Sequence, residues 1–181
     1  MYARSKSSKL WGILILVTLM MTYILPIPLY AFDIIREGTS PSFEVIDRSS
    51  GLSNLSVSSM IQDKDGFIWF GTQGGLNRYD GRHFKTYTNN PYDADGLNHN
   101  LIQTMFYDEV EHVIWIGTYQ GVSRFDIASD TFKHFTVDES GLSNPVVVAI
   151  EKDAEGFIWV GTLDGLNKID LATDKIGRAH V

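Results

Sequence analysis

The stretch GFIWFGTQGGLNRYDG, residues 66–81, decides the fold because related sequences occur three times in the chain. The related stretches HVIWIGTYQGVSRFDI and GFIWVGTLDGLNKIDL begin at His112 and Gly156. A Gly-Leu pair precedes each of the three, at Gly51, Gly96 and Gly141. The sequence therefore contains an internal repeat with a period of about 45 residues, which indicates a repeat architecture.

Within one repeat, the residue pattern favours short strands over helices. In the first repeat the segments VSSMIQD, FIWFGT, LNRYD and FKTYT are separated by the turns KDG, QGG and GRH. A helix would need apolar residues at three- and four-residue spacing over about ten positions, and no repeat supplies them. Four antiparallel strands per period of this length are typical of a β-propeller blade. We therefore predict an all-β fold, with helix only before Ala31.

The repeat also gives the predicted organisation of the chain. A signal peptide or membrane anchor is expected over residues 1–31, followed by a lead-in over 32–50 in which Phe43 to Ile46 would be an orphan outer strand. The predicted blades cover residues 51–95, 96–140 and 141–176, and residues 177–181 are expected to be a truncated end. The third blade is expected to lack its outer strand. Three blades cannot close a ring, since propellers have about 4 to 8 blades.

The N-terminus has the layout of a secretory signal peptide. Basic residues lead into an apolar run from Leu10 to Leu25, and a small residue follows at Ala31. The run is 16 residues long, which is near the lower limit for spanning about 30 Å of hydrocarbon, so an uncleaved anchor is the alternative. In either case the rest of the chain is predicted to lie outside the cytoplasmic membrane.

Composition restricts the partners. The formal net charge of −7 argues against binding to a phosphate backbone, which needs a basic face. The chain has no cysteine, so disulfides and thiolate metal sites are excluded. The acidic turns DKDG at Asp63 and DADG at Asp93 lack the later acids of a calcium loop, and the histidines lack metal-ligand spacing. No cofactor and no metal site are predicted.

Certain tryptophans and glycines recur at matching places in each repeat. They are Trp69, Trp115 and Trp159, Gly71, Gly117 and Gly161, and Gly75, Gly121 and Gly165. A large ring in the middle of the second strand can pack between neighbouring blades, and the glycines permit tight backbone approach. A sugar-stacking platform of tryptophans is the weaker alternative, because a residue present in every blade is best explained by a structural role that every blade shares.

The segment GLSN...IQDKDGFIWFGTQGGLNRYDG resembles the two-component regulator propeller repeat, and the resemblance covers residues 51–176. The second repeat departs from it at His99, which replaces Asn, and at Val122-Ser123, which replace Leu-Asn. The resemblance implies a seven-bladed ring in the extracytoplasmic sensor of a longer, dimeric receptor, with this chain as its N-terminal part and further blades as its neighbours. It also implies oligosaccharide ligands and a cytoplasmic histidine kinase or diguanylate cyclase output.

The candidate ligand-binding residues are the variable positions directly after each Gly-Thr pair. They are Gln73, Tyr119, Gln120 and Asp164. Tyr119 could stack on a sugar face, while the others supply hydrogen-bonding groups. The alternative, that these are ordinary turn residues, stays open.

Two classes of function follow. The favoured one is a non-catalytic, ligand-sensing propeller segment of a membrane receptor. The alternative is an exported propeller enzyme, such as a glycan lyase or hydrolase, which would need clustered acids, histidines or tyrosines at the mouth of the ring. The sequence offers no such cluster and therefore no catalytic residue.

Overall fold

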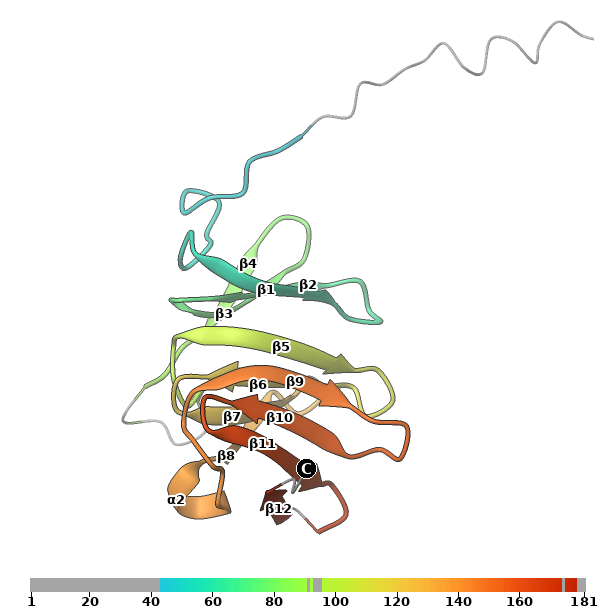
Figure 1. Cartoon of the computed structure of the whole chain (residues 1–181). Helices are drawn as coiled ribbons and strands as arrows, with labels where there is room; N and C mark the ends of the chain where they lie inside the picture. Colours follow the sequence, from blue (N-terminus) through green and yellow to red (C-terminus); the bar gives the residue numbers. More distant parts are fainter. Residues whose placement is uncertain (1–42, 91, 93–95, 174, 179–181) are drawn as a thin grey trace, which may run out of the picture. The chain divides into compact units, whose positions relative to one another are not determined.

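The computed structural model describes residues 43–90, 92, 96–173 and 175–178. Within the unit Val45–Val181, the chain forms three four-stranded antiparallel sheets, one after another (Figure 1). The first contains β1 (Val57–Gln62), β2 (Ile68–Thr72), β3 (Gly75–Tyr79) and β4 (Phe84–Tyr87). The second contains β5 (Ile102–Asp108), β6 (Val113–Thr118), β7 (Gly121–Asp126) and β8 (Thr131–Phe135). The third contains β9 (Val147–Lys152), β10 (Ile158–Thr162), β11 (Gly165–Asp170) and β12 (Lys175–Arg178). The predicted four-stranded antiparallel sheets are confirmed, and the third sheet also has the outer strand that it was expected to lack.

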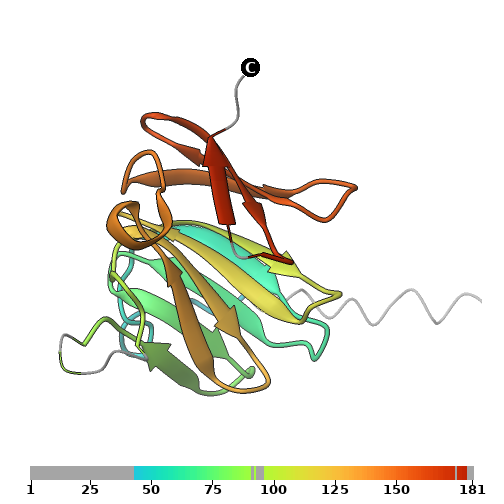
Figure 2. The same ribbon diagram turned by 90° about the horizontal axis from the view of Figure 1, so that it is seen from below.

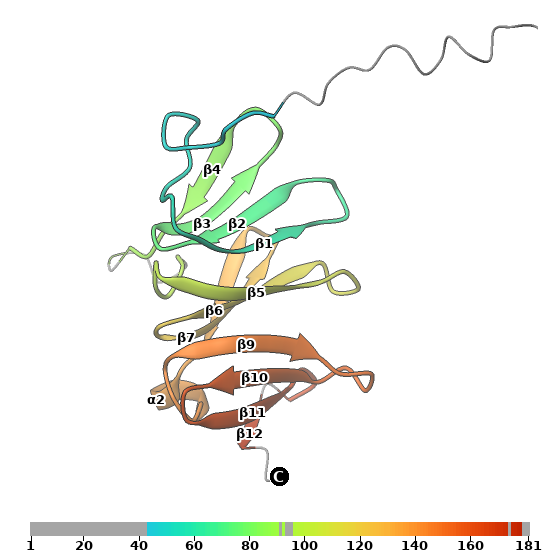
Figure 3. The same cartoon turned by 45° about the horizontal axis from the view of Figure 1, so that its top comes forward.

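The strands of each sheet follow sequence order, so every neighbouring pair is joined by a short turn. The first strands β1, β5 and β9 lie side by side, and β2 and β6 also contact β5 and β9, the first strands of the next sheets (Figures 1 and 3). The sheets follow one another face to face, as the view from below also shows (Figure 2). This is the arrangement expected of consecutive propeller blades.

The first sheet-to-sheet core is built around Trp69, which is fully buried. Its ring lies 5.5 Å from the ring of Phe125 on the second sheet, in an edge-to-face arrangement. Ile114 and Ile116 of β6 complete the cover over Trp69 and Leu76. Burial of such rings against a neighbouring sheet is the main stabilising contribution available to a fold of this kind.

The second core repeats the first one sheet further along. Trp115 and Val122 are fully buried beneath Ile158, Val160 and Ile169 of the third sheet. Trp159 occupies the same place in the third sheet but is only half-buried. We expected Trp159 to be as buried as the other two; it differs because no described sheet covers that face.

Two kinds of glycine shape the sheets. Gly121 has φ 108°, and a Cβ there would lie 2.3 Å from the carbonyl oxygen of Phe135, so both conformation and space require glycine. Gly117 lies where the second and third sheets approach closely. A Cβ on Gly117 would lie 2.7 Å from methyl groups of Thr104 and Val147. The third sheet lacks this restriction at Gly161, whose nearest contact would be 3.4 Å away.

An aspartate anchors the tryptophan in the first and third sheets. The indole Nε1 of Trp69 donates to Asp63 Oδ2 at 2.7 Å, and Trp159 donates to Asp153 at 2.6 Å. Asp63 is itself buried and accepts two backbone N–H groups of its turn. The tryptophan is therefore held by hydrogen bonding as well as by packing.

The second sheet replaces this bond. Its first turn, after Asp108, is one residue longer, and the Asp108 carboxylate instead lies 2.5 Å from Lys152 Nζ on the third sheet. The Trp115 Nε1 atom is buried and has no hydrogen-bond partner among the described residues. At this position the second sheet therefore has an ion pair to the third sheet, whereas the first and third sheets have an aspartate–tryptophan hydrogen bond within one sheet.

Three local features differ from the prediction. Helix was expected only before Ala31, but α2 (Val137–Ser140) follows β8 because Thr136 caps the N–H of Glu139 and Gly141 ends the turn at φ 77°. Phe43 to Ile46 form no strand, since a strand needs a neighbour to satisfy its backbone groups. The third sheet has an outer strand, β12, because ladder pairing needs backbone groups rather than particular side chains.

The predicted signal-peptide segment lies outside the described residues. Among the residues that the structure describes, no helix is both long and apolar enough to cross a membrane.

Replacing Gly117 with Ala is expected to lower the free energy of unfolding by about 1–3 kcal/mol, because the new methyl group overlaps side chains of two sheets. Gly161→Ala is the matched control and should change stability little. Urea denaturation of both variants measures the difference. Equal losses in the two variants would contradict the close approach of the second and third sheets.

Trp69→Phe is expected to cost about 1–3 kcal/mol more than Trp115→Phe. The first substitution leaves the buried Asp63 carboxylate without its indole donor, whereas the second removes an N–H that has no partner. Both lose similar packing, so the difference between the two free energies of unfolding isolates the hydrogen bond. A Trp115→Phe variant as unstable as Trp69→Phe would show that the second sheet has an equivalent bond.

Candidate functional site

The predicted ligand-binding residues lie in the two-residue turns that join the second and third strands of each sheet. Gln73 lies between β2 and β3, Tyr119 and Gln120 between β6 and β7, and Asp164 between β10 and β11. All four side chains are exposed. The turns are bonded to the loops that lead into β1 and β9, so each lies at the entry end of the first strand.

The threonine at the end of each second strand closes its turn. The hydroxyl of Thr118 donates to the carbonyl of Gly121 at 2.9 Å and accepts the N–H of Gln120 at 3.0 Å. Thr72 and Thr162 make the same carbonyl bond, also at 2.9 Å. The backbone of each turn is therefore fixed, while the side chains of its two central residues vary between sheets.

A second polar group supports the turn from the preceding loop. In the first sheet, Ser53 Oγ lies 3.0 Å from the hydroxyl of Thr72 and accepts from Asn77 Nδ2 at 2.8 Å. In the third sheet, Ser143 and Asn167 form the same 2.8 Å bond. Asn77 and Asn167 are fully buried, so these bonds have little competition from water.

The second sheet exchanges the two residue types. The amide of Asn98 stands where the others have serine, with its Oδ1 3.1 Å from the hydroxyl of Thr118. Ser123 stands where the others have asparagine. The hydroxyl of Ser123 lies 3.1 Å from His134 Nδ1. Asn98 Nδ2 donates in addition to the carbonyl of Gln120 at 3.1 Å. The asparagine side chain is longer than that of serine, so Asn98 can reach the turn that carries Tyr119 and donate a hydrogen bond to its backbone.

The Tyr119 side chain leans over His99, with ring centroids 6.2 Å apart, and keeps 43% of its surface exposed. The neighbouring Gln120 lines a hollow of about 370 Å³. Its other lining residues are Thr136, Val137, Asp138, Glu139 and Pro145. Half of the lining residues belong to α2, which was not predicted although Thr136 and Glu139 have the spacing of a capping box.

The structure brings these side chains together only in part. Tyr119 and Gln120 are neighbours on one turn, while Gln73 and Asp164 occupy the corresponding turns of the adjacent sheets. The arrangement presents one aromatic face, two amides and one carboxylate on fixed turns. Such a set can stack and hydrogen-bond, but it contains no nucleophile paired with a base.

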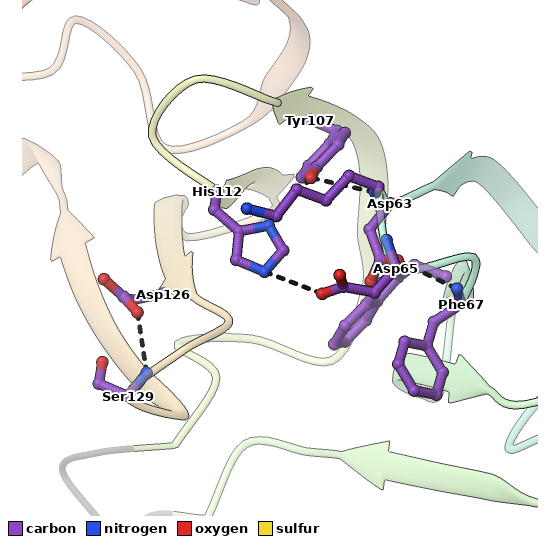
Figure 4. A network of polar contacts seen from close by, with 9 residues as sticks. Asp63, Asp65, Phe67, Tyr107, His112, Asp126 and Ser129 are labelled. Carbon is purple, nitrogen blue, oxygen red and sulfur yellow. Dashed lines mark hydrogen bonds and ion pairs between the residues drawn. The ribbon is translucent and has the colours of Figure 1, made fainter.

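A second polar cluster lies at the opposite ends of the first and second sheets (Figure 4). His112 Nδ1 lies 2.9 Å from the hydroxyl of Tyr107, and its Nε2 lies 3.3 Å from Asp65 Oδ2. The Tyr107 hydroxyl also accepts the N–H of Lys64. Both imidazole nitrogens have partners within this cluster, so it ties the first two sheets together.

The outer edges of the same two sheets share an ion pair. Lys85 Nζ lies 2.7 Å from Asp130 Oδ2, and the Tyr87 hydroxyl donates to the same carboxylate at 2.7 Å. Desolvation opposes the charged form, but these two donors hold the pKa of Asp130 below its ordinary value. Among the described residues, no group of three or more histidine, aspartate or glutamate side chains is placed to hold a metal ion.

Comparison with known proteins finds a family model that matches two segments of the chain, and solved structures with a similar fold. The two component regulator propeller family matches residues 51–74 and 140–164. Histidine kinase P4 of Formosa agariphila is 49% identical over 57 residues, which are 32% of this chain and 4% of that protein.

Two solved structures from B. thetaiotaomicron are similar over most of the chain. The extracellular domain assigned to a hybrid two component system is 29% identical, with a TM-score of 0.69, and the alignment covers 76% of this chain and 20% of that one. The extracellular domain assigned to a one component system is 25% identical, with a TM-score of 0.59, over 70% of this chain and 18% of that one. The chain therefore spans about a fifth of the length of these relatives.

The exchange of serine and asparagine predicts a rescue. Asn98→Ser and Ser123→Asn alone should each lower the free energy of unfolding by about 1 kcal/mol. The first variant places two short serine side chains opposite one another, and the second places two longer asparagine side chains there. The double variant restores the pairing of the first and third sheets and should regain at least half of the summed loss. Urea denaturation of the three variants gives the coupling energy, and strictly additive losses would refute it.

Proposed function

This chain carries repeats of the two-component regulator propeller family, and from that premise we propose that it is a ligand-sensing segment of a signal-transduction receptor. The observation that carries the proposal is the similarity, over most of the chain, to an extracellular domain assigned to a hybrid two component system. The segment itself supplies binding and shape, and the chemical output belongs to a cytoplasmic histidine kinase or diguanylate cyclase of the same receptor.

The segment is proposed to lie on the outer side of the cytoplasmic membrane. The similar structures are named as extracellular domains, and residues 1–31 have the composition of an export signal. Its net charge of −7 favours a partner other than nucleic acid. We further propose that the three sheets continue into a larger, seven-bladed ring, which extends the same sheet-on-sheet packing.

The proposed ligand is an oligosaccharide bound at the turns of the candidate site. Sugars present apolar ring faces together with hydroxyl groups, which suits an exposed aromatic ring beside hydrogen-bonding side chains. Tyr119 supplies the ring, and Asn98 holds the turn on which it stands. Gln73, Gln120 and Asp164 supply amide and carboxylate groups for the sugar hydroxyls.

Signalling requires that the ligand distinguish two receptor arrangements. A ligand that binds both arrangements of a dimer equally well shifts neither, whatever its affinity. The proposed segment therefore acts through the difference in binding free energy between the two arrangements. Fixed turn backbones favour this role because little ordering is needed when the ligand binds.

Replacing Tyr119 with Ala is expected to weaken oligosaccharide binding about tenfold or more, the effect of losing one stacking contact. Isothermal titration calorimetry of the receptor's ectodomain against a panel of oligosaccharides measures the affinity. Tyr92→Ala is the matched control, because Tyr92 is 98% exposed and lies on a different loop.

The possible results separate the site from the function. Binding that is equally strong in Tyr119→Ala and wild type would remove the proposed site and leave the sensor in place. Turnover of a sugar by the ectodomain, abolished by changing one acidic residue, would contradict the sensor function and favour the alternative of an exported enzyme.

A further inference from the structure

His99 departs from the repeat, because the other two sheets have asparagine at this position, Asn54 and Asn144. In those sheets the asparagine Oδ1 accepts the backbone N–H two residues further on, at 2.8 Å for Asn54 and 2.9 Å for Asn144. His99 does the same with its Nδ1, which accepts the N–H of Leu101 at 3.1 Å. The imidazole therefore replaces the amide in holding the loop that leads into β5.

The imidazole also adds a ring, which asparagine lacks. This ring lies beside the ring of Tyr119, with centroids 6.2 Å apart and planes inclined by 33°. The first and third sheets have Gln73 and Leu163 in place of Tyr119. The histidine and the tyrosine thus occur together, in the same sheet. We call His99 and Tyr119 the aromatic pair.

The aromatic pair belongs to the one sheet that has a described sheet packed on each side of it. Tyr119 nevertheless keeps 43% of its surface exposed, and His99 is partly exposed. The pair lies on the loop and the turn at one end of the sheet, whereas the neighbouring sheets cover its two faces. Its exposure is therefore a property of the site and not of an uncovered sheet face.

The hydrogen bond from Leu101 determines which imidazole nitrogen carries the proton. In a neutral imidazole one nitrogen accepts and the other donates. Since Nδ1 of His99 accepts the N–H of Leu101, the hydrogen lies on Nε2. Within the described part of the chain, this Nε2 has no hydrogen-bond partner. The aromatic pair therefore offers a ring face on Tyr119 and one directed N–H donor beside it.

We propose that His99 is a ligand-contacting residue of the candidate site. It packs against the Tyr119 ring and donates its Nε2–H to an oxygen of the sugar that stacks on this ring. A sugar carries hydroxyl oxygens around its apolar face, so stacking brings an acceptor close to a donor beside the aromatic ring. Because the backbone holds Nδ1, the direction of the donor is set before the sugar binds, and little ordering is needed. This inference deepens the proposed function and rests on it.

Carboxylates near the aromatic pair favour a neutral sugar. Asp164 occupies the corresponding turn of the third sheet, and Asp138 and Glu139 line the hollow beside Gln120. All three carboxylates are exposed. Like charges repel one another, so these carboxylates disfavour a sugar acid. Neutral oligosaccharides of glucose, xylose, mannose and galactose are therefore the probes for binding.

His99→Asn separates the two roles of the side chain. The asparagine can accept the N–H of Leu101, as Asn54 and Asn144 accept theirs, so thermal unfolding of the chain should not change. Binding of the neutral oligosaccharide should weaken about five- to tenfold, the effect of losing one hydrogen bond and one packing ring. Microscale thermophoresis of the full-length receptor in detergent measures the affinity. His83→Asn is the matched control, since the His83 side chain is 82% exposed on the turn before β4.

His99→Ala removes both roles, so it should weaken binding and also lower the midpoint of thermal unfolding. Equal affinities of His99→Asn and wild type would overturn the inference and leave the sensor function and the Tyr119 site in place. An equal fall of the unfolding midpoint in His99→Asn and His99→Ala would also overturn it, since the histidine would then act only through the fold. A wild-type receptor that binds none of the four kinds of oligosaccharide would overturn the proposed function together with this inference.

Discussion

The stacking of one sheet on the next, centred on the tryptophan of each second strand, is the interaction on which the rest of the structure depends. A four-stranded sheet with apolar residues on both faces cannot bury them alone, so its stability comes from its neighbours. Trp69 and Trp115 are fully buried because a following sheet covers them, and Trp159 is not. The close approach of the second and third sheets at Gly117 has the same origin.

The same packing prepares the candidate site. Shared residues hold the turns. A threonine hydroxyl closes each turn, and a serine–asparagine pair, with one member on the preceding loop and the other on the third strand, supports it. The side chains of the two central residues of a turn make none of these hydrogen bonds. They can therefore differ between sheets without loss of the fold. A receptor built from such repeats can vary its ligand contacts while its framework stays constant.

Much of the fold could be predicted because the sequence pattern is periodic. The tryptophans and glycines that recur in each repeat locate the strands, and the polar segments between them locate the turns. The partners of Asp63 and Asp108 could not be predicted, since one extra residue in a turn redirects the second carboxylate to another sheet. Of the reciprocal exchange of Asn98 and Ser123, the sequence comparison identified Ser123 as a departure but not Asn98, and only the structure brings the two residues together. A helix as short as α2 gives no periodicity to detect. The ligand-binding role of Tyr119 stays a prediction.

Hydrogen exchange of the backbone amides tests the central claim most directly, because protection reports the local free energy of opening. If stacking stabilises each sheet, the second sheet, covered on both faces, should exchange most slowly. The slowest amides should lie in β6, whose six residues are all buried, and the equivalent strands β2 and β10 should exchange faster. Equal protection in β2, β6 and β10 would contradict the account and would show that each sheet is stable without its neighbours.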